Sequence, residues 1–108
     1  MNLAMWLKKT QNVMVTPLGM QLQQIRPRIR CKDGFSLSVQ ASRSSYCEPR
    51  TCEPVWTKVE VGYPSAEEPL LNSYSESFGE GNPTEDIYPY VPVEVVEAVI
   101  EKHGGIID

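Results

Sequence analysis

The sequence has little of what a catalytic, membrane-spanning or disulfide-stabilised protein usually carries. Among 108 residues there are one histidine and three cysteines, and no apolar run approaches the roughly 18 residues needed to span a bilayer. An odd cysteine count is atypical of a small secreted disulfide scaffold, so we expect reduced thiols in a cytosol. HExxH, GxSxG and Gly-rich phosphate-loop motifs do not occur. We therefore expect a non-enzymatic protein without cofactor, metal or membrane segment.

The composition is that of one globular domain. Hydrophobic residues make up 41% and charged residues 22% of the chain, which is an ordinary balance for a packed protein. The net charge of −4 argues against non-specific binding to nucleic acid. The charge is segregated, because residues 21–50 contain six Lys or Arg and two acids. A domain this small buries proportionately little surface, so we expect a homo-oligomer.

The chain divides into an extension and one domain. Residues 1–19 are broken by Pro17 and Gly19, and we expect them to be a poorly ordered N-terminal extension. Residues 20–108 form the predicted domain. A segment rich in Ser, Pro, Gly and Glu at 64–86 predicts a long loop within it, either a functional flap or a variable surface loop.

The hydrophobic pattern predicts a small α+β fold. Residues 21–31 and 35–42 alternate as two strands around the Asp33-Gly34 turn, which predicts a β-hairpin. Residues 55–61 and 87–91 predict two further strands. Pro92 then begins a helix whose apolar positions recur at helical spacing. We expect an antiparallel sheet covered by this one C-terminal helix.

The first strand of the hairpin carries the strongest candidate site. Arg26, Arg28 and Arg30 share one parity, so a strand would place them on one face about 6.6 Å apart. Hydroxyl and amide groups would lie across the hairpin, and guanidinium groups bind phosphate or carboxylate in bidentate fashion. The sequence therefore predicts an anion-binding face. Its candidate ligand residues are Arg26, Arg28, Arg30, Ser38, Gln40, Ser42, Arg43, Tyr46 and Trp56.

The arginines, the cysteines and the histidine each have alternative interpretations. The arginines would pair with Glu60 or with acids of the long loop on a solvated face. The three cysteines are either idle thiols, a Cys47–Cys52 disulfide, or part of a zinc set with His103. His103 lies at the predicted helix end, where an imidazolium favourably meets the helix dipole.

From residue 25 onward the chain resembles a family of short uncharacterised proteins carried by bacteriophages and prophages. The matching segments are IRPRIRCKDG (25–34), SVQAS (38–42), YCEPR (46–50), VEVGYPS (59–65), YVPVEVV (90–96) and KHGG (102–105). The resemblance implies a phage accessory protein acting in the cytoplasm of the bacterial host, and small phage proteins of this kind often resemble inhibitors of host defence.

The residues and the resemblance together favour one hypothesis and leave two others open. We expect a binding protein that counters bacterial immunity by sequestering an anionic nucleotide signal without catalysis. The alternatives are a protein–protein inhibitor of a bacterial defence protein, similar to anti-CRISPR proteins and acting through the acidic loop, and a structural phage component.

Overall fold

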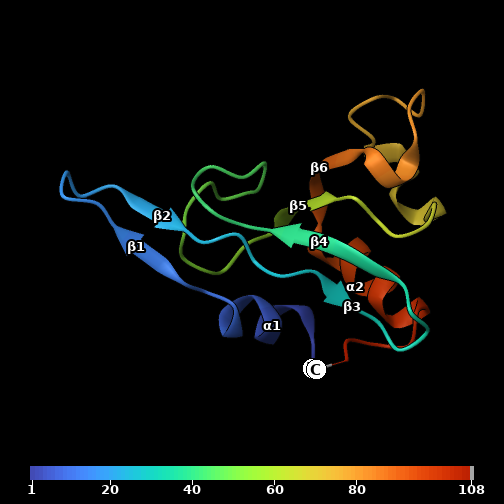
Figure 1. Ribbon diagram of the computed structural model, residues 1–108, viewed down its shortest axis with the longest axis horizontal. Coiled ribbons are helices and arrows are strands. Elements are labelled where there is room, and N and C mark those ends of the chain that lie inside the picture. Colours follow the sequence, from blue (N-terminus) through green and yellow to red (C-terminus); the bar gives the residue numbers. More distant parts are fainter. Residues whose placement is uncertain (108) are drawn as a thin grey trace.

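The computed structural model describes residues 1–107 and shows an α+β fold, which confirms the predicted fold class. Two α-helices and two antiparallel sheets make up the structure, with two 3-10 helices inserted between the last two strands (Figure 1). In chain order the elements are α1 Leu3–Lys9, β1 Val13–Val15, β2 Gln21–Gln23, β3 Ile29–Arg30, β4 Ser36–Gln40, β5 Lys58–Gly62, η1 Pro69–Tyr74, η2 Pro83–Glu85, β6 Ile87–Pro92 and α2 Val93–Lys102.

The main sheet has four strands in the order β3-β4-β5-β6, and every neighbouring pair is antiparallel. The predicted hairpin is confirmed, with Ile29 opposite Leu37 and Arg30 opposite Ser36. Gly34 closes its turn with a φ of +97°, a conformation that glycine adopts without steric cost. The Asp33 side chain accepts the Phe35 N–H at 2.9 Å and so fixes the same turn.

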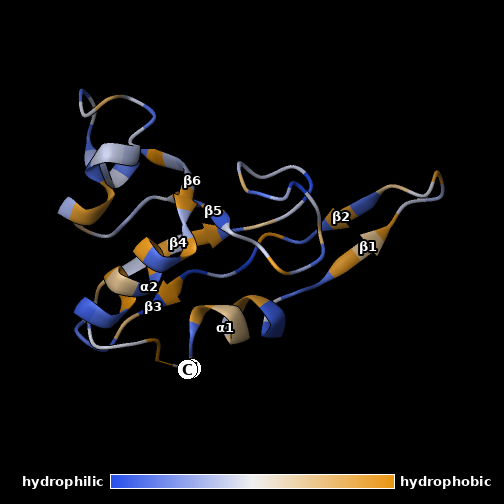
Figure 2. Ribbon diagram, turned by 180° about the vertical axis from the view of Figure 1, so that it is seen from behind, coloured by the Kyte–Doolittle hydropathy of each residue, from blue (hydrophilic) through white to orange (hydrophobic). Residues whose placement is uncertain are grey.

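The core lies between one face of this sheet and the two α-helices. The inward side chains of β4 and β5 alternate as predicted, and Leu37, Val39, Val59 and Val61 are each 0% exposed. One stripe of α2 (Val96, Val99 and Ile100) is buried against them. Figure 2 shows the hydrophobic colouring concentrated on the central strands and on part of α2. Burying such side chains stabilises the fold by about 1.5–3 kcal/mol each.

The N-terminal segment differs from the poorly ordered extension that we expected. Asn2 caps α1 by accepting the Met5 N–H at 2.8 Å, and α1 contacts α2. Leu3, Trp6 and Leu7 follow the i, i+3, i+4 spacing of a helix face and are buried. These three apolar side chains supply the burial that orders the segment.

Strands β1 and β2 form a separate two-stranded sheet that extends from the body as an arm (Figure 1). The predicted strand at 21–31 therefore splits, since Gln21–Gln23 pairs with β1 and only Ile29–Arg30 pairs with β4. The arm contributes to the elongated shape of the molecule, which measures 41 × 31 × 20 Å along its principal axes.

The predicted long loop at 64–86 has local structure. It contains η1 and η2, and Leu71 of η1 is fully buried. The Asp86 carboxylate accepts the hydroxyl protons of Ser75 and Ser77, which ties the loop to the start of β6. No helix within residues 1–107 combines the length and the apolar character that crossing a membrane requires.

Candidate functional site

The predicted arginine row is divided between the interior and the surface. Arg30 is exposed and Arg28 is half-buried, but Arg26 is only 2% exposed. The prediction that all three guanidinium groups share the outward face is therefore wrong for Arg26. Ile25, which a continuous strand over 21–31 would place on the face opposite to the arginines, is 87% exposed.

Arg26 is held inside by neutral acceptors. Its Nη1 donates to Ala41 O at 2.6 Å, its Nη2 to Leu7 O at 3.3 Å, and its Nε to Thr10 Oγ1 at 3.0 Å. The guanidinium carbon also lies 5.4 Å from the centre of the Trp56 ring, within the range of a cation–π contact. Burial lowers the pKa of Arg26 from its ordinary value.

The physical reason for this inversion is the loss of strand pairing before residue 29. The side-chain amide of Gln40 accepts the Arg26 N–H at 2.9 Å and donates to the Arg26 carbonyl at 3.0 Å. A side chain thus replaces the backbone partner that a continuous strand would supply. Pro27, which follows, has no N–H to donate to a ladder. The parity of residues 28–30 therefore does not extend back to residue 26.

Trp56 is also an interior residue and not part of an open ligand face. Its side chain is 4% exposed, and the indole N–H donates to Thr51 O at 3.0 Å. Tyr46 remains on the surface, 40% exposed, and its ring centre lies 5.9 Å from that of Tyr90. The guanidinium carbon of Arg50 lies over the Tyr46 ring, 5.7 Å from its centre. Tyr46 therefore stays accessible, whereas Trp56 packs on Arg26.

Three predicted residues line one polar hollow on the outward side of the main sheet. Ser38, Gln40 and Ser42 come from β4 and the residues after it, and the hollow has a volume of about 280 Å³. Strand alternation brings these side chains to one side, as the sequence predicted. The full lining is Gln23, Ile25, Ser38, Gln40, Ser42, Ser44, Ser45, Glu60 and Tyr63.

The polar groups of this hollow are partly ordered by one another. Ser42 Oγ lies 2.7 Å from Ser45 Oγ and 3.3 Å from Ser44 Oγ, and the Gln40 amide donates to Ser38 Oγ at 3.1 Å. Glu60 Oε1 accepts the Tyr46 N–H at 2.9 Å. The hollow therefore presents pre-positioned hydroxyl groups and one carboxylate.

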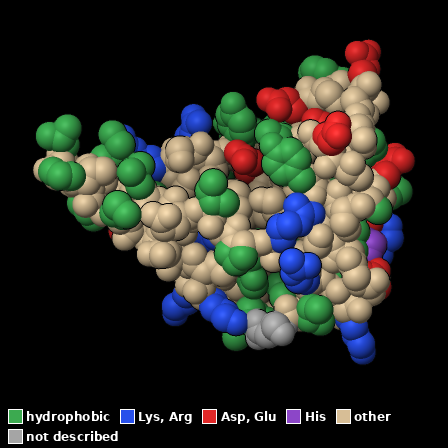
Figure 3. Space-filling view, in the orientation of Figure 1, with side chains coloured by type: hydrophobic (Ala, Val, Ile, Leu, Met, Phe, Trp, Pro, Cys, Tyr) green, Lys and Arg blue, Asp and Glu red, His purple; other side chains and the backbone are tan. Residues whose placement is uncertain are grey.

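Arg28 borders the hollow. Its Nε and Nη2 donate to Ser36 Oγ at 3.2 and 3.1 Å, and Nη2 also donates to the carbonyl of Tyr63, a lining residue. Figure 3 shows basic side chains over the region of β3 and β4. Arg30 lies on the adjoining edge strand, and Arg43 is exposed in the segment that follows β4. The hollow thus has positive charge at its border and negative charge inside.

The cysteines are three buried free thiols. Burial raises the pKa of Cys31 and of Cys47, so both thiols are protonated at neutral pH. The Cys47 thiol donates to Ser42 O at 3.1 Å. The Cys47–Cys52 disulfide considered above is not formed, and no cluster of three His, Cys, Asp or Glu side chains among residues 1–107 is arranged to hold a metal ion.

Sequence reasoning missed a charged cluster around the single histidine. His103 Nδ1 lies 2.6 Å from Asp33 Oδ2, and His103 Nε2 lies 2.8 Å from Glu68 Oε1. Lys102 Nζ contacts the same Glu68 oxygen at 2.9 Å, and the imidazole stacks on Phe35 with 3.9 Å between ring centres. These contacts join the hairpin turn, the end of α2 and the start of η1. Positions so far apart in the chain leave no local signal.

The protonation states follow from these contacts. Burial alone would lower the pKa of His103, but the hydrogen bonds and charges of Glu68 and Asp33 outweigh it and leave the pKa raised. Burial would raise the pKa of Glu68, but hydrogen bonds from the Leu70 N–H, Lys102 and His103 outweigh it and hold the pKa below its ordinary value. Both imidazole nitrogens are engaged with carboxylates, so the cluster links three elements together.

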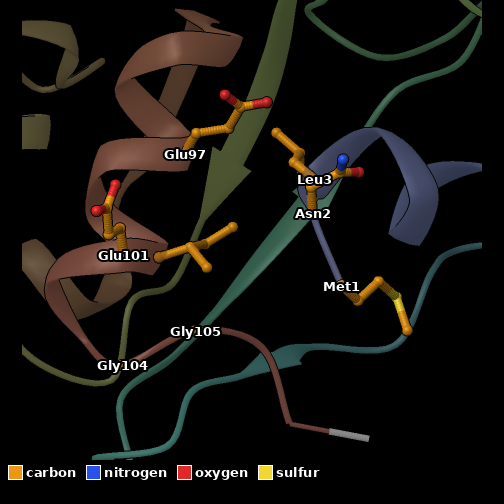
Figure 4. A pocket seen from close by; sticks show the side chains of 8 residues that line it. Met1, Asn2, Leu3, Glu97, Glu101, Gly104 and Gly105 are labelled. Atoms are coloured by element: carbon orange, nitrogen blue, oxygen red, sulfur yellow. The ribbon is translucent and has the colours of Figure 1, made fainter.

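A second hollow of about 430 Å³ lies between the start of α1 and the end of α2. Figure 4 shows Asn2 and Leu3 of the α1 end on one side of this hollow and Glu97 and Glu101 of α2 on the other. A neighbouring hollow of about 250 Å³ shares Leu3 and Glu97 and is lined mainly by apolar side chains. The sequence pattern did not predict these hollows, because residues 1–19 were expected to be an extension. The helical spacing of Leu3, Trp6 and Leu7 was the available signal.

No family model, no curated protein and no solved structure that was compared with this chain matches it.

Proposed function

We propose that the protein is a non-catalytic binding protein whose serine-lined hollow holds a nucleoside phosphate. The observation that carries this proposal is the meeting of Ser38, Ser44 and Glu60 in one hollow with Arg28 at its border. A nucleoside phosphate offers a hydroxylated sugar, an aromatic base and an anionic group. The hollow and its border offer a partner for each.

Glu60 supports recognition of the sugar. A carboxylate accepts hydrogen bonds from paired hydroxyl groups, as acidic residues do for the ribose of dinucleotides. One oxygen of Glu60 accepts the Tyr46 N–H, which fixes the carboxylate within the hollow. The neighbouring serine hydroxyls donate or accept as a ligand requires.

Arg28 supports recognition of the phosphate, and Tyr63 supports recognition of the base. The Ser36 hydroxyl and the Tyr63 carbonyl fix the Arg28 guanidinium, which reduces the entropy lost when it binds a phosphate. The Tyr63 side chain is 48% exposed and offers a ring on which a base can stack. Arg30 adds a second, exposed cation on the adjoining strand.

The cellular role that we propose is capture of a nucleotide signal used in bacterial immunity. The resemblance to phage and prophage proteins supports this setting, and capture requires a complementary hollow without any bond-breaking machinery. The single histidine supports a role without acid–base chemistry, because Asp33 and Glu68 occupy both of its nitrogens. Sequestration then depends on affinity and on the amount of protein made.

Titration calorimetry with AMP, ADP-ribose and a cyclic dinucleotide tests the proposal. We expect at least one of these nucleotides to bind. Arg28→Ala should weaken its binding by about 10- to 100-fold, because the substitution removes one charge-assisted hydrogen bond. Glu60→Gln keeps an acceptor for Tyr46 but removes the charge, and we expect a loss of about 10-fold. Glu94→Gln, on the exposed side of α2, is the matched control. Absence of binding to all three probes would refute the proposed ligand class.

A second candidate function is inhibition of a defence protein through the surface of the 64–86 loop. Glu76, Glu80 and Glu85 are exposed there, and Figure 3 shows acidic side chains gathered at that end of the molecule. Glu68 anchors the loop through Lys102 and His103. Such an anchored acidic surface is suited to a basic, nucleic-acid-binding groove. Stoichiometric capture of a host protein, lost on replacing the three exposed glutamates by glutamine, would favour it.

A further inference from the structure

The arm formed by β1 and β2 has an unusual surface for this protein. Residues 10–25 contain none of the chain's 10 Lys or Arg and none of its 14 Asp or Glu. Apolar side chains instead face outward: Met14 is 54%, Val15 61% and Leu18, at the tip, 96% exposed. Figures 2 and 3 show the hydrophobic character of the extended end of the molecule. Exposed apolar groups gathered in this way mark an interaction surface.

The hydrogen bonds of the arm show which backbone groups remain for a partner. The Thr16 N–H donates to Met20 O at 2.8 Å, and the Gln24 N–H donates to Asn12 O at 2.9 Å. Antiparallel pairing alternates, so Met14 and its partner Leu22 also hydrogen-bond to each other. The backbone groups of Val13 and Val15 consequently point away from β2, to the outer edge of β1.

The two outer edges of the arm differ in their surroundings. Beside β2, Cys52 Sγ lies 4.0 Å from the Gln21 carbonyl, and the Gln11 side chain donates to Cys52 O at 3.2 Å. The segment around Cys52 thus approaches the β2 edge. Along the β1 edge, no hydrogen bond from another described residue reaches the backbone of Val13 or Val15. A two-stranded ribbon is marginally stable in water, and natural edges are usually protected by charge or proline.

We propose that β1 pairs antiparallel with β1 of a second copy of this chain, which makes the arm a dimerisation element. Val13 would pair with Val15 of the second copy, and the two Met14 residues would face each other across a two-fold axis. The sheet would then run β2-β1-β1-β2 through both molecules. Edge pairing of a strand with its own copy is self-complementary by symmetry.

The tip and the base of the arm fit the same arrangement. In this register Leu18 of one copy lies beside Thr10 of the other, where a hollow of about 370 Å³ opens. Gln11, Gln24, Ile25 and Pro27 contribute to its lining, and Ile25 offers an exposed apolar surface. The dimer would therefore bury the most exposed apolar side chain of each arm in its partner.

Charge restricts where two copies can meet and which partners the arm can attract. Each molecule has a net charge of −4, so two copies repel each other at most surfaces. The arm has no charge and lets them meet without like-charge contact. The same lack of charge offers nothing to attract nucleic acid, an anionic membrane or a strongly charged protein.

Cysteine cross-linking tests the register with a matched control. Non-hydrogen-bonded antiparallel neighbours lie about 4.5 Å apart between Cα atoms, which is within disulfide range. We expect Met14→Cys to form a covalent dimer under mild oxidation. Leu22→Cys, its cross-strand partner on the same face and 41% exposed, should remain uncross-linked because the two copies of residue 22 lie on outer strands. Equal cross-linking of both variants, or of Leu22→Cys alone, would overturn the proposed register.

Sedimentation equilibrium tests the dimer itself. The wild-type chain should be dimeric at a concentration where Val15→Pro is monomeric, because proline removes an outer-edge N–H. Gln21→Pro removes the equivalent N–H on the β2 edge and should stay dimeric; circular dichroism checks that both variants are folded. A wild-type monomer up to about 1 mM, a concentration at which only weak pairing escapes detection, would overturn the proposal. So would a monomer that floats with neutral phosphatidylcholine vesicles, since the arm would then be a membrane contact.

Discussion

Replacing Arg26 by alanine should destabilise the fold far more than replacing either neighbouring arginine. The substitution removes donors to the carbonyls of Ala41 and Leu7 and to the Thr10 hydroxyl. Each buried acceptor left without a partner costs about 1–3 kcal/mol, and the lost side chain leaves a cavity beside Trp56. We therefore expect the free energy of unfolding to fall by about 3–5 kcal/mol.

Arg28 and Arg30 provide graded controls of the same residue type. The Arg28 side chain is half-buried and donates to one hydroxyl and one carbonyl, so Arg28→Ala should cost about 1 kcal/mol. Arg30 is exposed, and Arg30→Ala should change the free energy of unfolding by less than about 0.5 kcal/mol. Urea unfolding followed by circular dichroism measures all three on one scale.

The size of the Arg26 effect also distinguishes two accounts of a buried cation. Within residues 1–107 the guanidinium has only neutral acceptors, so its hydrogen bonds to them must offset its desolvation. If those bonds only balance the desolvation, Arg26→Ala would relieve as much as it removes. A change within about 1 kcal/mol of that for Arg30→Ala would therefore refute the view that Arg26 holds α1 to the sheet.

Three further outcomes follow from the contacts described above. The raised pKa of His103 means that its stabilising contribution is fully present below its ordinary pKa of 6.5 and is lost as the pH rises through the folded value; His103→Gln should remove this alkaline loss in urea titrations at several pH values. Glu68→Gln weakens the contacts of a 1% exposed carboxylate with Lys102 and His103, and should lower the free energy of unfolding by about 1.5–3 kcal/mol, whereas Glu80→Gln should be neutral. Trp6→Ala should cost about 3–5 kcal/mol in the same assay because Trp6 is 5% exposed, and a negligible change would mean that α1 is not part of the folded core.

The parts of the fold that the sequence predicted are those with local causes. The Asp33-Gly34 turn needs only a carboxylate acceptor and a residue tolerant of positive φ, and both are present. The alternation of β4 follows from the period of a strand. The C-terminal helix follows from its apolar spacing and from the proline that precedes it. The hydroxyl and amide side of the candidate site was predicted for the same reason.

The parts that were wrong depend on contacts between distant segments. Arg26 has the same parity as Arg28 and Arg30, and contacts with distant residues, among them the side chain of Gln40 and the carbonyls of Leu7 and Ala41, turn it inward. The strand assigned to residues 21–31 was split because β1, which was not expected, pairs with its first part. Pairing between distant positions follows from tertiary packing, which overrides a local pattern.

The end of β2 and the segment that follows it connect the two proposed surfaces. Gln23 and Ile25 line the serine-rich hollow, and Ile25 also lines the hollow at the base of the arm. The Gln23 amide donates to Thr10 O at 3.2 Å and to Gln24 O at 2.8 Å. Further along the same segment, the guanidinium of Arg26 donates to Ala41 O and holds the chain in place. Ordering the arm against a second copy would therefore also order one wall of the hollow. If a ligand that contacts that wall strengthens the dimer, linkage requires that dimerisation strengthens binding of the ligand by the same factor.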